Sequence, residues 1–245
     1  MRLRMFCGPN GSGKSTMIKA IRQRIPLGVY LNADDIEKEL SDTGQISLAK
    51  FLPDFSLDTD DRFKLAMQDS RLLDKGTELS SLGKFKLHEG IAYWEGGGLS
   101  SYQAAFVTEF LREELRKQKV SFSFETVMSH PSKASFLADS KQAGYRTYVY
   151  FICTKSPAIN LARVSNRVKK GGHAVPDEKV ISRYWRSLGL LESAVKSAYR
   201  AFIFDNSADS FELVLETSNY GKHYTLHRDL PNWAMVYGLK PLLGS

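Results

Sequence analysis

The sequence predicts an α/β fold over residues 1–245, built as one domain around a mostly parallel sheet of five strands flanked by helices. Three observations support this fold class. Apolar strand-like runs alternate with helical patterns, as in parallel sheets whose crossover connections are helices. A glycine-rich stretch, GPNGSGKST, lies between the first strand-like run and the first helical pattern. The composition, 42% hydrophobic and 25% charged, is that of a chain able to bury a core.

The first 100 residues are expected to contain two strands of this sheet and an insertion. Residues 2–7 and 28–31 are short apolar runs, and the second of them ends in acids. Residues 42–100 lack a clear core pattern, so we interpret them as an insertion on the substrate or lid side, with a helix over 60–75 and a hairpin over 84–95. Apolar residues at helical spacing follow the glycines: Met17, Ile18, Ile21 and Ile25.

The rest of the chain contains residues that typically begin and end helices. Ser132 is expected to cap a helix that Gly144 ends, and Ser156 and Pro157 to begin another. Pro176 should open a long helix that runs to about residue 199. The remaining pattern predicts a helix over 102–118, strands over 120–126, 145–153 and 200–207, and a C-terminal hairpin over 211–227.

Charge and cysteine usage limit the class of protein. No apolar run approaches the roughly 18 residues of a membrane helix, and no long apolar stretch follows the N-terminal arginines, so we expect a cytoplasmic protein without a membrane partner. Cys7 and Cys153 lie in apolar runs, which favours two buried, reduced thiols. The net charge is +7, and residues 163–200 hold nine Lys and Arg against three acids. This segment is either a lid over a polyphosphate or a nucleic-acid surface, and its place after a strand favours the lid.

The glycine-rich stretch matches the phosphate-loop pattern G-x-x-x-x-G-K-[ST] in the required strand–loop–helix context. Glycines let successive backbone N–H groups face phosphate oxygens, and the helix that follows adds its positive end. Lys14 is expected to reach the β- and γ-phosphates, and the Ser15 hydroxyl to ligate Mg²⁺. The nucleotide-binding residues predicted from this pattern are Gly8, Asn10, Gly11, Ser12, Gly13, Lys14, Ser15 and Thr16.

Acidic residues follow two of the predicted strands: Asp34 and Asp35 after one, Glu125 at the end of another. Carboxyl ends of strands line the ligand crevice of an open α/β sheet, and a carboxylate there can accept a hydroxyl proton during phosphoryl transfer. Two alternatives remain open, because Asp34 or Asp35 could cap a helix beginning at Ile36, and Glu125 could bond a helix N-terminus. Ser129, His130 and Lys133 are expected to line an acceptor pocket.

Basic residues on the predicted lid supply the complementary charge. Arg163 and Arg167 are four residues apart, so they share a helix face that Lys170 continues. Arginines that meet the equatorial oxygens of the transferred phosphate can contribute about 10³–10⁵ in rate. The competing interpretation is a solvated basic helix face.

In this order and spacing, GPNGSGKST, NADDI, FETVMSHPSK, NLARVSNRVKKGGHAVP and FDNS resemble the zeta toxin family of small-molecule kinases, and most closely its chromosomal members. The resemblance is weakest over 42–100 and after about residue 210. It implies a P-loop kinase fold like that of nucleoside monophosphate kinases. It also implies transfer of the ATP or GTP γ-phosphate to a hydroxyl of a nucleotide sugar such as UDP-N-acetylglucosamine, with an antitoxin protein as a candidate partner.

The resemblance also implies roles for single residues. Asp34 falls at the position of the catalytic base, and Glu125, with Thr126, at the position of the acid that contacts the substrate. Arg163 or Arg167 matches the first lid arginine. The second lid arginine aligns best with His173, and Arg183 or Arg186 could supply its charge.

Two rival functions come from the same observations. The isoelectric point of about 9.3 and the basic lid would also suit a polynucleotide or tRNA kinase. A non-catalytic switch, driven by a nucleotide and bound to a protein partner, would need only the phosphate loop. His223 and His227 are four apart but lie in a predicted strand, which disfavours a metal site.

Overall fold

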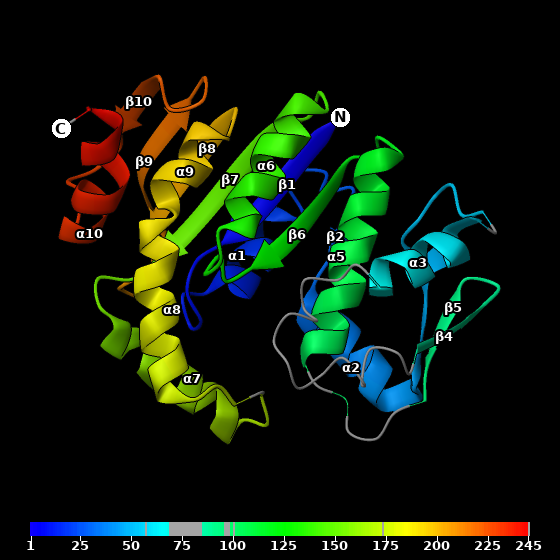
Figure 1. Ribbon diagram of the computed structural model, residues 1–245. Helices are drawn as coiled ribbons and strands as arrows, with labels where there is room; N and C mark the ends of the chain where they lie inside the picture. The colour runs from blue at the N-terminus through cyan, green and yellow to red at the C-terminus, as the bar shows by residue number, and fades with distance from the viewer. Residues whose placement is uncertain (57, 69–84, 96–98, 100, 173, 245) are drawn as a thin grey trace. The chain divides into compact units, whose positions relative to one another are not determined.

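The computed structural model describes residues 1–244 apart from 57, 69–84, 96–98, 100 and 173 (Figure 1). It divides into two compact units, which are described separately below. Unit 1 comprises Met1–Gly28 and Ser121–Ser245, and unit 2 comprises Val29–Val120. The predicted insertion at 42–100 lies within unit 2.

The sheet of unit 1 has the strand order β10-β9-β8-β7-β1-β6. Strands β1, β6, β7 and β8 are parallel to one another, whereas β9 pairs antiparallel with both β8 and β10. The mostly parallel sheet and the C-terminal hairpin predicted from the sequence are therefore confirmed. The strands are β1 (Arg2–Cys7), β6 (Phe122–Thr126), β7 (Arg146–Cys153), β8 (Arg200–Asp205), β9 (Glu212–Ser218) and β10 (His223–Leu226).

The central strand β1 is covered on both faces and forms part of the apolar interior of unit 1. All its residues except Arg2 are buried, as in parallel strands packed between helices. Phe6 stacks on Tyr150 and Tyr150 on Phe202, with ring centroids 4.6 and 5.0 Å apart. In Figure 1, α6 and α9 lie over one face of this sheet. The helices of unit 1 are α1 (Lys14–Ile21), α6 (Ser132–Gln142), α7 (Pro157–Lys169), α8 (Asp177–Gly189), α9 (Leu191–Lys196) and α10 (Asn232–Ala234), followed by single turns over Met235–Leu239 and Lys240–Leu242.

Unit 2 has a small antiparallel sheet of its own, in the order β3-β5-β4. The predicted hairpin over 84–95 is confirmed as two of these strands, whereas the sequence pattern missed β3. Phe63 is fully buried and packs edge-on against Phe85, Phe106 and Phe110. The elements of unit 2 are β2 (Val29–Leu31), α2 (Ala33–Thr43), β3 (Gln45–Ser47), the single turn η1 (Leu48–Lys50), α3 (Asp58–Gln68), β4 (Phe85–His88), β5 (Ile91–Trp94) and α5 (Ser101–Lys117).

Three helix boundaries differ from the sequence prediction. Helix α2 begins at Ala33 rather than Ile36, because the Asn32 side chain accepts a hydrogen bond from the Asp34 N–H and caps it. Ser132 is the first residue of α6 and not its cap. The expected helix over 176–199 is two helices that meet at Leu190. The cap of α7 at Ser156, with Pro157 in its first turn, is confirmed.

Candidate nucleotide-binding site

The glycine-rich stretch of unit 1 forms a tight loop between the end of β1 and the start of α1. Gly8 has φ +139° and Gly11 has φ +74°, in the region that favours glycine. A Cβ atom on Gly11 would lie 2.5 Å from the carbonyl oxygen of Asn160, and one on Gly8 would collide with that of Ile152. Both positions therefore require glycine for space as well as for backbone conformation.

Lys14 folds back over this loop. Its Nζ donates to the carbonyl oxygens of Gly8 and Pro9, both at 3.0 Å, and the residue is only 7% exposed. The loop thus holds a buried ammonium group on its own backbone.

Ser15, in the first turn of α1, and Glu125, in β6, come together at the loop. In the sheet, Glu125 of β6 is the register partner of Phe6 in β1, so its side chain lies beside the start of the loop. The Ser15 hydroxyl lies 3.1 and 3.2 Å from the two carboxylate oxygens of Glu125. A hydroxyl next to a carboxylate supplies hard oxygen donors, which suit Mg²⁺. Ser15 and Glu125 therefore fit the Mg²⁺ ion that accompanies a nucleoside triphosphate.

Two buried asparagines donate hydrogen bonds to backbone carbonyl oxygens of the loop. Asn160, at the start of α7, donates from Nδ2 to the carbonyl oxygen of Asn10 at 2.5 Å, and Asn206, after β8, donates to that of Ser12 at 2.8 Å. The Ser12 hydroxyl is fully buried and has no hydrogen-bond partner among the described residues. Arg183, predicted to bind substrate, reaches the loop instead: its guanidinium lies 3.4 Å from Oδ1 of Asn10.

The sequence interpretation missed Asn160. The one signal available was an asparagine in the first turn of an otherwise apolar helix face, where an unpaired amide would be costly. Asn160 is also hydrogen bonded to the hydroxyl of Thr154, whose carbonyl oxygen accepts a 2.6 Å hydrogen bond from the Tyr184 hydroxyl. Burial raises the pKa of Tyr184 well above its usual range, so this hydroxyl stays protonated.

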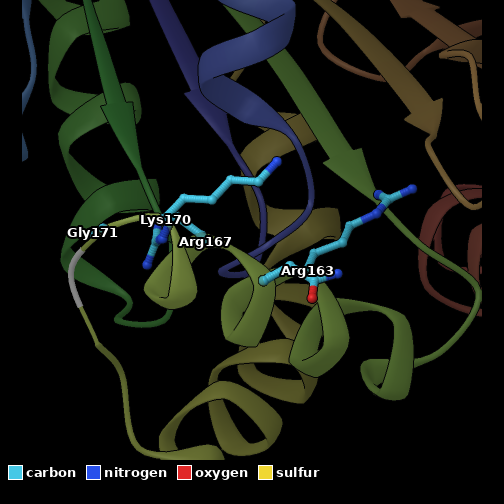
Figure 2. A pocket seen from close by; sticks show the side chains of 6 residues that line it. Arg163, Arg167, Lys170 and Gly171 are labelled. Carbon is cyan, nitrogen blue, oxygen red and sulfur yellow. The ribbon is translucent and has the colours of Figure 1, made fainter.

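The predicted lid arginines lie at a basic hollow on α7 (Figure 2). This cavity has a volume of about 460 Å³, and its lining residues are Arg163, Asn166, Arg167, Lys170, Gly171 and Gly172. Figure 2 shows the Arg163 side chain extending away from those of Arg167 and Lys170. Its guanidinium donates to the carbonyl oxygens of Asn206 at 2.7 Å and Ala208 at 3.2 Å. Arg163 thereby ties α7 to the segment that holds Ser12.

The segment after β6 has a role in building α6. Nδ1 of His130 accepts a hydrogen bond from the Ser132 N–H at 3.2 Å and lies 2.9 Å from the Ser132 hydroxyl. The cap position of α6 is Pro131, which has no side-chain cap, and the ring of His130 bonds the N–H of the first helical residue, so the capping role that the sequence assigned to Ser132 is wrong. Thr126 accepts a bond from the Met128 N–H at 3.3 Å. Lys133 and Ser129 are half-buried on the same segment.

The acids predicted to act with the loop lie in unit 2. Asp34 and Asp35 occupy the first turn of α2, and both are exposed. Their predicted capping role is wrong, since Asn32 has it, and their predicted catalytic and substrate-binding roles stay predictions.

The remaining candidates are His173 and the two cysteines. His173 lies outside the described residues. Burial raises the pKa of Cys153 to about 12, and it raises that of Cys7 further, against the lowering effect of Lys14. Both residues are therefore neutral, buried thiols, as predicted. Among the described residues, no three His, Cys, Asp or Glu side chains gather as a metal site, and none of the helices there could cross a membrane.

Comparison with solved structures gives likenesses of low sequence identity. The AvrRxo1-ORF1:AvrRxo1-ORF2 complex solved with ATP has a TM-score of 0.54 and 13% identity over 92% of this chain. The match covers 60% of that chain, so the present chain spans well under two thirds of its length. The PezAT chromosomal toxin–antitoxin system of Streptococcus pneumoniae has a TM-score of 0.48 and 11% identity, over 95% of this chain and 75% of that one.

Comparison of sequences gives matches that cover most of this chain. An uncharacterized protein of Haemophilus influenzae is 24% identical over 179 residues, which make up 73% of this chain and 89% of that protein. A model of the AAA domain family matches residues 3–191. Because this match covers more than half of the sequence and includes the phosphate loop, the chain belongs to the AAA domain family.

Proposed function

We propose that the protein is a kinase that transfers the γ-phosphate of ATP or GTP to a hydroxyl group of a small molecule. The observation that carries this proposal is the arrangement of Lys14, Ser15 and Glu125. An ammonium group, a hydroxyl and a carboxylate from three points of unit 1 meet at one phosphate loop. These are the groups needed to hold a nucleotide triphosphate and its metal ion.

In this mechanism the loop amides hold the β- and γ-phosphates, and Lys14 moves from its two carbonyls to the phosphate oxygens. Ser15, backed by Glu125, would hold Mg²⁺, which neutralises charge on the phosphates when it is bound. Asp34 is our candidate for the base that accepts the acceptor's hydroxyl proton. Arg167, with Lys170 beside it, is our candidate for stabilising the transferred phosphoryl group.

The acceptor class is proposed from the resemblance to zeta toxins. It is a nucleotide sugar such as UDP-N-acetylglucosamine, and growth inhibition with an antitoxin partner would follow from it. The proposed substrate contacts come from Asp35, Glu125, Thr126, Ser129, His130, Lys133, His173 and Arg183.

The test is transfer of labelled γ-phosphate from ATP or GTP to a panel of UDP-sugars, free sugars, nucleosides and RNA. We expect a labelled small molecule from the wild type and none from Lys14→Ala. Lys19→Ala is the matched control, because Lys19 lies on the exposed side of α1 and its loss should leave transfer intact. Melting temperatures of all three proteins establish that the variants are folded.

The basic cavity on α7 favours one second candidate, a polynucleotide kinase. In the same assay, label in RNA but in no small molecule would support this candidate and refute the first. Nucleotide hydrolysis without any labelled acceptor would refute both and leave a nucleotide-driven switch.

A further inference from the structure

The segment 205–208, where β8 ends, lies against the phosphate loop of unit 1. Nδ2 of Asn206 donates to the carbonyl oxygen of Ser12 at 2.8 Å, and it occupies the space that a Cβ atom on Gly13 would need. The Asn206 N–H donates to the carbonyl oxygen of Cys153, also at 2.8 Å. Because Gly13 is the residue immediately before α1, any shift of this segment would disturb the loop where its helix begins.

The side chain of Asp205 fixes how this segment leaves the strand. Asp205 is only 9% exposed, and each of its carboxylate oxygens accepts a hydrogen bond. Oδ1 accepts from the Ser207 N–H at 2.6 Å, which closes a tight turn around Asn206. Oδ2 accepts from Nε1 of Trp233 at 3.0 Å. A buried carboxylate is costly to leave without such partners, so the two bonds together constrain where Asn206 lies.

Trp233 brings a second part of the chain to this carboxylate. It belongs to α10, which follows the C-terminal hairpin (Figure 1). Its side chain is buried, and its ring lies against that of Phe151 in β7, with centroids 6.0 Å apart. The indole N–H therefore reaches Asp205 from a position that packing fixes. The bonds of Trp233, Asp205 and Asn206 connect α10 with the phosphate loop.

The segment has further attachments that do not involve this carboxylate. The guanidinium of Arg163 donates to two of its carbonyl oxygens, and the Lys155 N–H donates to the Ser207 hydroxyl at 2.7 Å. These bonds remain when Asp205 or Trp233 is replaced by a residue of similar shape. Such variants should therefore fold, with the segment still present but less exactly placed against the loop.

We propose that Asp205 is a positioning residue for nucleotide binding and that Trp233 fixes the orientation of its carboxylate. Both act through Asn206, whose amide holds the Ser12 carbonyl oxygen and with it the direction of the loop N–H groups that face the phosphates. This inference rests on the proposed function, because it requires that the loop bind a nucleoside triphosphate. It adds that α10 sets the affinity for the nucleotide and not the rate of the chemical step.

The experiment is calorimetric titration of the full chain with MgATP and with MgGTP. Asp205→Asn should weaken binding of the preferred nucleotide about tenfold, because the new amide N–H₂ faces the indole N–H of Trp233. Trp233→Phe keeps a ring against Phe151 but removes the N–H, and it should weaken binding about three- to fivefold. Asp209→Asn makes the same change of charge at an exposed acid four residues further on, and it should bind like the wild type.

Steady-state kinetics in the labelled-phosphate assay give a second measurement. The KM for the nucleotide should rise by the same factors in both variants, while kcat stays within about twofold of the wild type. A fall in kcat with an unchanged KM would overturn the positioning role. A lower melting temperature with unchanged nucleotide affinity would also overturn it, because the two residues would then only stabilise the fold.

The double variant Asp205→Asn/Trp233→Phe tests whether the two residues act together. Both substitutions break the same hydrogen bond, so the double variant should bind nucleotide no more weakly than Asp205→Asn alone. Losses that add would show two independent effects and refute the connection through Trp233. If the wild type binds nucleotide and both single variants bind it equally well, this inference alone fails. A wild type that binds no nucleotide would refute the proposed function as well.

Discussion

The basic cavity of unit 1 and the cavity of unit 2 that is lined by Asp35, Glu39 and Lys50 differ in how their charged side chains are held. At the basic cavity in unit 1, Arg163 is already tied to backbone carbonyls, as is Lys14 in the phosphate loop. At the cavity in unit 2, by contrast, Asp35 is held by nothing that the structure describes. Arg163 and Lys14 are thus held by the backbone, whereas the exposed Asp35 carboxylate has no protein partner among the described residues.

The largest effect on catalysis is expected from an arginine of the basic cavity. Arg167→Ala should lower kcat by about 10³–10⁵ if this exposed arginine of the basic cavity stabilises the transferred phosphoryl group as proposed. Arg163→Ala should instead lower stability by about 1–3 kcal/mol, since it removes two hydrogen bonds to carbonyls. Steady-state kinetics and thermal melting of both variants measure the difference. An Arg163 variant with the greater loss in kcat and an unchanged melting temperature would reverse the assignment.

The next largest effect on catalysis is expected from the acids in the first turn of α2. Asp34→Asn should lower turnover about 10²–10⁴-fold while leaving nucleotide affinity near that of the wild type, the result expected for loss of a general base. Asp42→Asn serves as the control of equal charge change on α2. Unimpaired turnover in Asp34→Asn would move the role to Asp35 or Glu125.

A glycine in each unit gives a third comparison. Gly11 and Gly44 have φ +74° and +71°, but a Cβ on Gly11 meets the Asn160 carbonyl, whereas Gly44 has open space around it. Gly44→Ala should therefore cost about 1–2 kcal/mol from backbone strain alone. Gly11→Ala should cost more, and it should also weaken nucleotide binding, which calorimetry would detect. Equal losses of stability with equal nucleotide affinity would show that loop packing does not matter.

The smallest effect is expected at the start of α2. Asn32→Ala removes the side-chain cap of this helix and should cost about 1 kcal/mol. For a chain of this size, the melting temperature should fall by roughly 2–4 °C. Asn32→Asp, which keeps a capping oxygen, should recover most of the loss. A variant as stable as the wild type would mean that Asp34 or Asp35 can replace the cap.

Much of unit 1 could be predicted from the sequence because its signals are local. The phosphate loop needs glycines at fixed positions, and β1, β7 and β8 are short apolar runs bounded by turn residues. The cap at Ser156 was predicted for the same reason. Serine is a common helix cap, so the sequence favoured Ser132, but α6 begins one residue earlier than that cap would require, after Pro131.

Unit 2 was harder to predict because its structure depends on distant contacts. Strand β3 is three residues long and pairs with β5, more than forty positions later in the chain, so no pattern within Gln45–Ser47 identifies it. The role of Asn160 was missed for a similar reason, since its partner, Asn10, is 150 residues away. Long-range pairing of this kind leaves little trace in periodicity.

The position of Lys14 has a consequence for how the protein would select its ligand. An anion that reaches the loop meets an ammonium group that already donates to two internal acceptors, so any exchange of those bonds lowers the measured affinity. Compounds with a single weak charge gain little from this exchange. Chains of linked phosphates, which present several oxygens at once, gain the most, and the resting loop therefore disfavours sulfate and inorganic phosphate relative to a triphosphate.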